Sequence, residues 1–324
     1  MASSKEIGIQ NIIEMVSDEG EQIDAIAEKR GWFRGDKQSP FYNSIRLYME
    51  GSLSLELTID AITTPIEKVY SVPENKRFNK RNDSPSVEGF LWDLWYSVLH
   101  IAKRTPWRDT TAQTKLVDLV RALKAHPDPP VPEHKRDWVA SQTKLWSVLK
   151  MIGWAASESW NDSPGYGAGY TVPEIHAWTN VNAFVAHLTQ SEISDFFIYS
   201  IYAMRDALED DQKDIANGQH RKASAITQLD TRVPAAAVWA ITLGRMLWEK
   251  NENLKPTDPR HGNPGKGGIL WEKEGGEAEF STSRYAFWAR RFRDVSSDDR
   301  LAAETREIAT EAYITMEGIV KATQ

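Results

Sequence analysis

Apolar residues recur along most of the chain at intervals of three and four positions, which is the spacing of one face of an α-helix. The clearest such stripe consists of Val87, Leu91, Trp95, Val98 and Ala102. No segment sustains the alternation of apolar and polar residues that marks a half-buried strand. We therefore predict an all-α fold of about ten to fourteen helices, arranged as an irregular multi-helix bundle or as an α-α superhelical array.

Polar residues next to these stripes predict where helices begin. Ser54 is placed to accept a hydrogen bond from the first turn of a following helix, as an N-cap does. Thr110 and Gln113 have the spacing of a capping box. Ser84 and Pro85 predict the start of the helix that carries the clearest stripe, because proline suits the first helical position.

The strongest interruption of the pattern is segment 126–132, which has four prolines in seven residues. Proline is disfavoured inside a helix, so this segment is the best candidate for a linker. We expect a single helical domain over residues 1–324, with possible halves 1–125 and 133–324 joined by this segment. A second loop, 255–276, is rich in glycine and proline, and loops of this length are usually functional or mobile.

Composition narrows the classes of function. The 324 residues include no cysteine, which excludes disulfides, thiol catalysis and thiolate metal sites. A formal net charge of −7 offers no overall basic footprint, so we expect no nucleic-acid partner. No apolar run approaches the roughly 18 residues that span a bilayer, and the N-terminus lacks the apolar stretch of a signal peptide. We expect a cytoplasmic protein without a membrane span, and the sequence leaves the oligomeric state open.

The 13 tryptophans, with 10 tyrosines and 10 phenylalanines, are the unusual feature of the composition. Aromatic residues at helical spacing usually belong to a core, and they also line ligand cavities. For the second interpretation, the candidate substrate-binding residues are Trp95, Trp154 and Trp239. The candidate catalytic residues are Glu158, Tyr199 and Tyr202. Glu158 lies in the apolar stretch MIGWAASESW, where a buried carboxyl could act as a general acid, and exposure at the helix end is its alternative.

Residues 210–214 read DDQKD and match the DDxxD string with which class I terpene cyclases bind Mg²⁺. Asp210, Asp211 and Asp214 would then hold magnesium and a diphosphate. A second acidic motif of the required pattern is absent, and the string lies at a helix end, where acidic residues are usually solvated. We therefore expect these carboxylates to be exposed and metal-free, and we assign no metal and no cofactor.

The string GNPGKGG at residues 262–268 invites comparison with a phosphate-binding loop. It departs from that motif because Lys266 is followed by glycine instead of serine or threonine, and because no strand precedes it. We expect a flexible surface loop.

Three parts of the chain together carry a resemblance. They are FLWDLWYSVLHIAKRTPWRDTTAQTKLVDLVRALKAHPDPP, then DFFIYSIYAMRDALE with VPAAAVWAITLGRMLWE, and then DPRHGNPGKGGILW with FSTSRYAFWARRF. From about Tyr42 to Phe292 the chain resembles a large family of filamentous-fungal proteins catalogued only as a domain of unknown function. The resemblance implies an all-helical fold and a fungal, intracellular setting, and it supplies no catalytic residues. Some members are encoded near secondary-metabolite genes, which favours small-molecule chemistry.

These observations lead to three hypotheses of function. The first is a cofactor-independent enzyme of fungal secondary metabolism, such as a cyclase or a pericyclase of the Diels–Alder type, which acts on an apolar small molecule in an aromatic-lined cavity. The second is a non-catalytic helical protein-interaction module. The third is a magnesium-dependent enzyme similar to terpene cyclases. A bound apolar metabolite would favour the first hypothesis, and a stoichiometric protein partner would favour the second.

Overall fold

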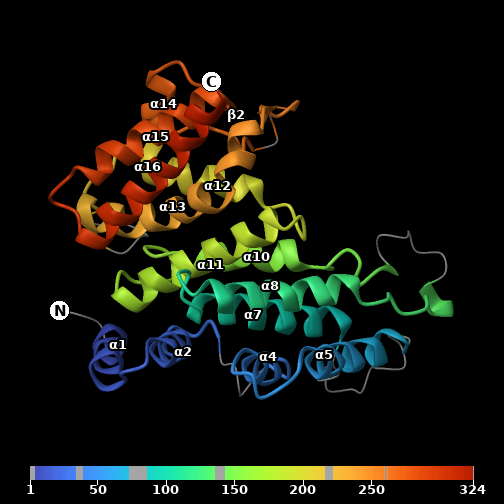
Figure 1. Cartoon of the computed structure of the whole chain (residues 1–324). Helices are drawn as coiled ribbons and strands as arrows, with labels where there is room; N and C mark the ends of the chain where they lie inside the picture. Colours follow the sequence, from blue (N-terminus) through green and yellow to red (C-terminus); the bar gives the residue numbers. More distant parts are fainter. Residues whose placement is uncertain are drawn as a thin grey trace. The chain divides into compact units, whose positions relative to one another are not determined.

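The computed structural model describes residues 4–33, 39–72, 86–135, 143–215, 222–258, 260 and 262–323. Within these ranges it contains thirteen α-helices and a pair of two-residue strands (Figure 1). The predicted all-α fold is therefore confirmed, and the number of helices lies within the predicted range. Contacts between Cα atoms group the chain into two compact units, Met1–Ser163 and Pro164–Gln324, which we describe separately.

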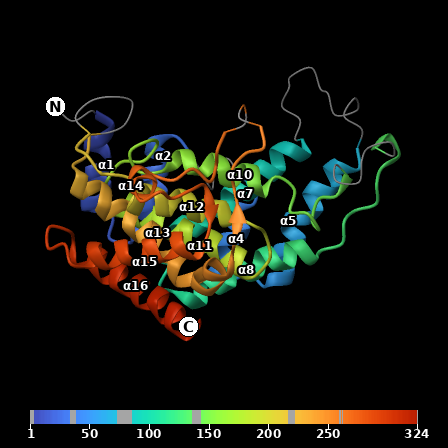
Figure 2. The ribbon, with the colours of Figure 1, turned by 90° about the horizontal axis from the view of Figure 1, so that it is seen from above.

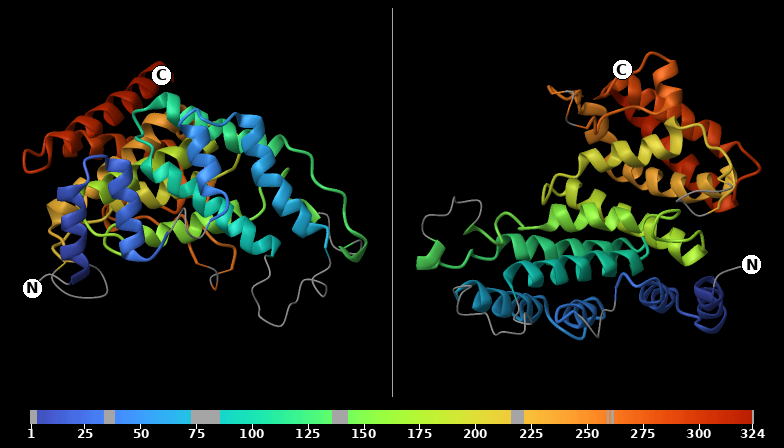
Figure 3. Two further views of the ribbon diagram at one scale, coloured as in Figure 1. Left: turned by 90° about the horizontal axis from the view of Figure 1, so that it is seen from below. Right: turned by 180° about the vertical axis from the view of Figure 1, so that it is seen from behind.

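Helix α7, Val87–Arg104, is the centre of the first unit and packs against α2, α4, α5, α8 and α10. The helices around it are α1 Ser4–Met15, α2 Glu19–Arg30, α4 Tyr42–Met49, α5 Leu55–Tyr70, α8 Thr110–Ala125 and α10 Ile152–Ser159. The right-hand view of Figure 3 shows α7 and α8 side by side. Leu91, Trp95 and Val98 of the predicted stripe are almost fully buried, and each such side chain stabilises the fold by about 1.5–3 kcal/mol.

Helix α13, Ala225–Glu249, is the centre of the second unit and packs chiefly against α11 and α16. The other helices are α11 Val172–Gln190, α12 Phe197–Met204, α14 Ile269–Lys273, α15 Thr282–Ser296 and α16 Ala303–Thr323. Figure 2 shows α15 and α16 running together. A Cβ atom at Gly244 of α13 would lie 2.7 Å from Ile319 Cδ1 of α16, so glycine permits this close approach.

A short antiparallel pair closes the base of the glycine-rich loop in the second unit. Strand β1, Glu252–Asn253, pairs with β2, Glu279–Phe280. The N–H of Leu254 continues the pairing by donating to the carbonyl of Ala278 at 2.9 Å. The two ends of the segment between the strands are therefore held together by backbone hydrogen bonds.

The structure confirms one predicted helix start and corrects another. Ser54 caps α5, since its Oγ accepts a hydrogen bond from the N–H of Leu57 at 3.2 Å. Helix α8 begins at Thr110, but its cap is Asp109, whose carboxylate accepts a hydrogen bond from the first turn at 2.9 Å. The predicted capping box is wrong because Gln113 is buried and donates to a core carbonyl. An aspartate one position earlier takes the capping role.

The start of α7 is also fixed by a side chain. Ser86 accepts a hydrogen bond from the N–H of Gly89 at 2.9 Å. Ser84 and Pro85, from which we predicted this start, lie outside the described residues. The cap that the structure shows is therefore Ser86.

The proline-rich segment 126–132 contains no helix and lies within the first unit. The division of the chain into halves at this segment stays a prediction. None of the described helices combines the length and the apolar character needed to cross a bilayer. The cytoplasmic compartment stays a prediction too.

Candidate functional site

Two of the predicted catalytic residues lie together in the second unit. Tyr199 and Tyr202 are three positions apart on α12, and their ring centroids are 5.7 Å apart at an interplanar angle of 75°. Both side chains are half-buried. Edge-to-face aromatic pairs of this kind are favourable beyond their buried area. The two tyrosines therefore form one aromatic surface, close to the polar residues that follow α12.

Two of the predicted substrate-binding residues belong to the helical cores. The side chains of Trp95 and Trp239 are fully buried. Trp95 Nε1 donates to the carbonyl of Lys150 at 2.6 Å, and Trp239 Nε1 donates to Asn182 Oδ1 at 2.8 Å. A buried indole with a satisfied N–H is typical of a core. The assignment of these two residues to substrate binding stays a prediction.

The remaining two candidates lie on the surface of α10 in the first unit. The side chain of Trp154 is 65% exposed. Glu158, one turn later, is also exposed and accepts a hydrogen bond from Asn161 Nδ2 at 3.1 Å. Of the two positions considered for Glu158, buried and exposed, the structure shows the exposed one, because this face of α10 points to solvent.

Helix α12 continues as a π-helix, η3, over Arg205–Glu209. The N–H of Asp210 donates to the carbonyl of Arg205, five positions back, at 3.0 Å. π-helical turns are rare and frequently occur at functional sites, because they shift side chains out of the ordinary helical register. Here Arg205 and Asp206 stay partly exposed, whereas Glu209 is fully buried.

Polar side chains around η3 and the adjoining face of α13 form a group that we call the α12–α13 polar cluster. Its members are Tyr202, Arg205, Asp206, Asp210, Gln212 and Arg232. Arg205 Nε donates to Asp206 Oδ1 at 3.2 Å, and its guanidinium lies 5.4 Å from the centroid of the Tyr202 ring. Arg232 donates to Gln212 Oε1, and Gln212 Nε2 donates to the carbonyl of Asp206 at 2.8 Å. The cluster thus brings two cations and two carboxyls to one place.

Two carboxyls of the cluster bind their protons more tightly than ordinary aspartates do. Burial raises the pKa of Asp206, Arg205 and Arg232 oppose this, and the charge of Asp210 adds to it. Burial also raises the pKa of Asp210. Even so, 49% of the Asp206 side-chain surface is accessible. A carboxyl that is desolvated and still reachable is suited to donate a proton to a bound molecule.

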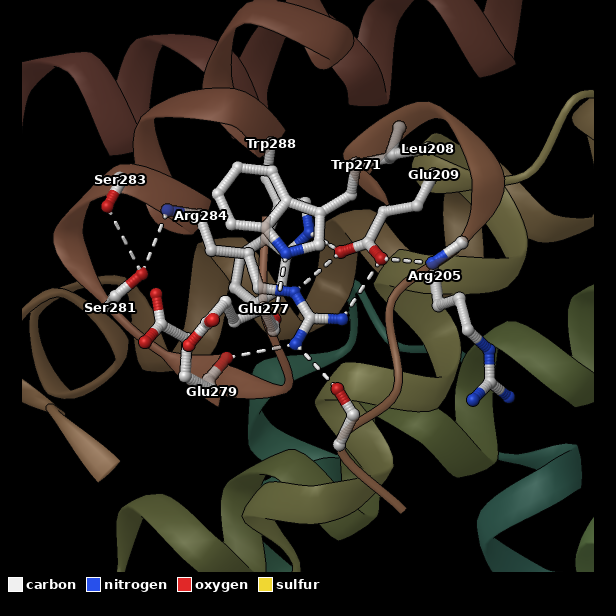
Figure 4. Close-up of polar contacts among 12 residues, drawn as sticks. Arg205, Leu208, Glu209, Trp271, Glu277, Glu279, Ser281, Ser283, Arg284 and Trp288 are labelled. Atoms are coloured by element: carbon white, nitrogen blue, oxygen red, sulfur yellow. Dashed lines mark hydrogen bonds and ion pairs between the residues drawn. The ribbon is translucent and has the colours of Figure 1, made fainter. Parts of the chain in front are cut away.

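A fully buried ion pair between Glu209 and Arg284 supports the cluster from inside the unit (Figure 4). Oε1 of Glu209 accepts from Arg284 Nε at 2.8 Å and from Trp288 Nε1 at 2.6 Å. Oε2 accepts from Arg284 Nη2 at 3.0 Å and from the N–H of Gly268 at 2.8 Å. A buried ion pair is tolerated when hydrogen bonds satisfy both partners, as they do here.

The same ion pair holds the glycine-rich loop 262–268. Arg284 Nη1 donates to the carbonyl of Gly265 at 2.9 Å. The buried residues of the loop are Gly265, Gly267 and Gly268. A Cβ atom at Gly268 would lie 2.6 Å from the carbonyl carbon of Glu209. The prediction of a surface loop is therefore wrong for these glycines, because their lack of a side chain lets the loop pack against η3.

The acidic string 210–214 is divided among different environments. Asp211 and Asp214 are exposed, and Asp214 Oδ1 accepts from the first backbone N–H of α13 at 2.8 Å. The prediction of exposure is wrong for Asp210, which is half-buried and accepts a hydrogen bond from the N–H of Ile269. In the part of the chain that the structure describes, no group of three or more His, Cys, Asp or Glu side chains could hold a metal ion.

Sequence reasoning missed Asp206, Gln212 and Arg232. The pair of aspartates at positions 206 and 210 has the spacing of one helical turn, which is a signal that two carboxyls lie close together. Arg232 is twenty positions from Gln212 and lies on α13, whereas Gln212 follows η3 outside any helix. No local pattern links residues this far apart, so their contact depends on how α13 packs.

A family model with the description Protein of unknown function (DUF3632) matches residues 95–292. The match ends at the residue where the resemblance found in the sequence ends, and it begins later than Tyr42. It contains both the α12–α13 polar cluster and the Glu209–Arg284 pair. No curated protein and no solved structure matches the chain. The fungal origin stays a prediction.

Proposed function

We propose that this chain, which belongs to the DUF3632 family, is an enzyme that transforms a small molecule by acid–base chemistry at the α12–α13 polar cluster. The observation that carries this proposal is the environment of Asp206. Burial raises the pKa of its carboxyl, yet about half of its side-chain surface can be reached. A general acid needs both properties.

The neighbours of Asp206 supply the other parts of such a reaction. Arg205 Nε, 3.2 Å from Asp206 Oδ1, would stabilise the carboxylate that forms when the proton leaves. The rings of Tyr199 and Tyr202 would offer an aromatic surface on which an apolar substrate can pack. The proton passes from Asp206 to the substrate and returns to the same carboxyl when the product loses a proton, so the acid is regenerated.

Proton-initiated cyclisation or isomerisation of an apolar molecule is the reaction class that best fits these groups. This proposal keeps the cyclase hypothesis from the sequence, but it assigns the role of proton donor to Asp206 instead of Glu158. That the protein acts in secondary metabolism, that it is a pericyclase, and that it is instead a protein-interaction module all stay predictions. The magnesium-dependent hypothesis is less well supported, because Asp214 and Asp210 both accept backbone hydrogen bonds, from the N–H groups of Ala225 and Ile269.

The proposal is tested by incubating the purified chain with a small-molecule extract of its source organism and following every mass by mass spectrometry. The expected result is the disappearance of one compound and the appearance of a product of equal mass. Asp206→Asn should abolish this conversion, and Tyr202→Phe should slow it less. Asp211→Asn, which changes an exposed neighbouring acid, should convert at the wild-type rate. Equal conversion by the Asp206→Asn and wild-type proteins would overturn the proposal.

A further inference from the structure

The first unit contains a polar pocket that the proposed function does not use. Its volume is about 440 Å³, and residues from α2, α4 and α7 form its walls together with Phe33. The wall residues that matter for its chemistry are Glu21, Asp24, Phe33, Tyr42, Arg46 and Arg104. A pocket of this size has room for one small organic molecule.

The carboxylate of Asp24 accepts three hydrogen bonds, from donors on α4 and α7. Oδ1 accepts from His100 Nε2 at 2.7 Å. Oδ2 accepts from the hydroxyl of Tyr42 at 2.8 Å and from Arg104 Nη1 at 2.6 Å. Groups held in this way keep their positions when a ligand arrives, which reduces the entropic cost of binding.

The protonation states of these groups follow from their surroundings. Burial tends to raise the pKa of Asp24, but the hydrogen bond and charge of His100, with the charge of Arg104, lower it overall. Burial lowers the pKa of His100, and the hydrogen bond and charge of Asp24 oppose this shift. Asp24 is therefore an anion and Arg104 a cation at neutral pH.

The pocket presents equal numbers of positive and negative side chains. Glu21 and Asp24 provide two carboxylates, and Arg46 and Arg104 provide two guanidinium groups. Arg104 is paired with Asp24 at 2.6 Å, and Arg46 is paired with Glu50, next to the pocket, at 2.6 Å. A ligand with one sign of charge would lie close to two groups of the same sign and be repelled by them. A ligand that carries both signs can place each beside its opposite. Such a balance of charges is better suited to a zwitterion than to a ligand with a net charge.

Phe33 adds an apolar surface to this charged site. One face of its ring stacks on the imidazole of His100, with centroids 4.1 Å apart and an interplanar angle of 24°. The hydroxyl-bearing ring of Tyr42 meets it edge-on at 5.2 Å. A small apolar side chain of the ligand can pack against these rings while its charged groups are paired.

We propose that this pocket binds a free α-amino acid, with the ammonium group beside Glu21 and Asp24 and the carboxylate beside Arg46 and Arg104. The size of the pocket, the balance of its charges and the aromatic surface all fit this class of molecule. The inference is independent of the proposed function, because it concerns other residues in the other unit.

The test uses the full chain and the twenty L-amino acids as probes in isothermal titration calorimetry. We expect at least one of them to bind with a dissociation constant below about 1 mM. Its N-acetyl derivative, which lacks the ammonium charge, should bind at least about tenfold more weakly, and so should its carboxamide, which lacks the carboxylate. Failure of all twenty to bind, or equal binding of either derivative, would overturn the proposal.

Substitutions locate the binding in this pocket. Glu21→Gln and Arg46→Gln remove charges that lie at its rim, so the fold should be retained, and each should weaken binding at least about fivefold. Glu56→Gln on α5 and Arg121→Gln on α8 remove exposed charges of the same kinds elsewhere and should leave binding unchanged. Wild-type affinity in both pocket variants would show that the amino acid binds elsewhere, which contradicts the proposal.

Discussion

Arg284 Nε donates to Glu209 Oε1 at 2.8 Å, although the two residues are 75 positions apart and neither side chain has any exposed surface. The pair joins α15 to the end of η3, and it also holds Gly268 and Trp288 through the same carboxylate. A buried ion pair is stable only while both partners are present, because removal of one leaves the other charge buried without a counter-charge. It thereby makes the position of η3 depend on residues that follow much later in the chain.

Glu209→Gln should destabilise the protein strongly. The substitution preserves the shape of the side chain but leaves the Arg284 charge buried without a counter-charge. We expect the free energy of unfolding to fall by about 3–5 kcal/mol, the usual cost of breaking a buried pair from one side. Urea denaturation followed by circular dichroism measures this change.

Arg245→Ala is the matched control for that experiment. Arg245 pairs with Glu249 at 3.2 Å on α13, but both side chains are largely exposed. Exposed pairs of this kind contribute little, so the free energy of unfolding should change by less than about 0.5 kcal/mol. Similar losses in both variants would show that the Glu209–Arg284 pair has no special role.

Tyr285→Phe should leave the protein as stable as before or make it more stable. The hydroxyl of Tyr285 is buried and finds no hydrogen-bond partner among the described residues. Removing a buried polar group without a partner relieves its desolvation cost, and we expect a gain of up to about 1 kcal/mol in the free energy of unfolding. Thermal and urea denaturation both measure it.

Tyr70→Phe provides the contrast, since the chemical change is the same. The hydroxyl of Tyr70 donates to the carbonyl of Thr143 at 2.7 Å. Its removal should lower the free energy of unfolding by about 1 kcal/mol, because a satisfied hydrogen bond is lost. If Tyr285→Phe destabilised the protein as much as Tyr70→Phe, the hydroxyl of Tyr285 would have to possess a partner.

Gly268→Ala should destabilise the second unit by about 1–3 kcal/mol, the range for an overpacked core. The added Cβ would lie 2.6 Å from the carbonyl carbon of Glu209 and 2.5 Å from Asp210 Oδ1, so the loop and η3 would have to separate. Gly318→Ala is the control: its Cβ meets no atom within 4 Å on α16, and alanine suits a helix better. That variant should gain about 0.5–1 kcal/mol. A loss in both, measured by urea denaturation, would contradict this account of the loop.

The helices could be predicted from the sequence because each depends on a local pattern. The stripe around Trp95 correctly identified the buried face of α7, and Ser54 correctly identified the cap of α5. The prediction of the cap was wrong at α8, because Asp109, next to Thr110, is the residue that caps this helix. Two adjacent residues with similar capping chemistry cannot be ranked without the backbone conformation.

The sites could be predicted only in part, because they depend on contacts between distant segments. Helical spacing alone places the rings of Tyr199 and Tyr202 side by side on α12, and their assignment as catalytic residues stays a prediction. The pairing of Arg284 with Glu209 has no sequence signal, since it arises from the packing of α15 against η3. The pocket around Asp24 likewise needs α2, α4 and α7 to converge, which periodicity does not reveal.

The raised pKa of Asp206 predicts a specific dependence of stability on pH. Burial favours the protonated form in the folded state, so the folded pKa exceeds the unfolded value of 3.8. Between these two values the folded state binds more protons than the unfolded state. The free energy of unfolding therefore decreases as pH rises through that window, and it is insensitive to this group below about pH 3.8.

Asp206→Asn should remove this dependence, because asparagine does not titrate and resembles the protonated acid. The difference in the free energy of unfolding between the variant and the wild type should therefore grow in favour of the variant as pH rises above about 3.8. Urea denaturation at a series of pH values measures it. Asp211→Asn, at an exposed position of the same segment, should show a nearly constant difference over the same range. A constant difference for Asp206→Asn as well would mean that Asp206 ionises like an ordinary surface aspartate, and it would remove the basis for assigning it as the proton donor.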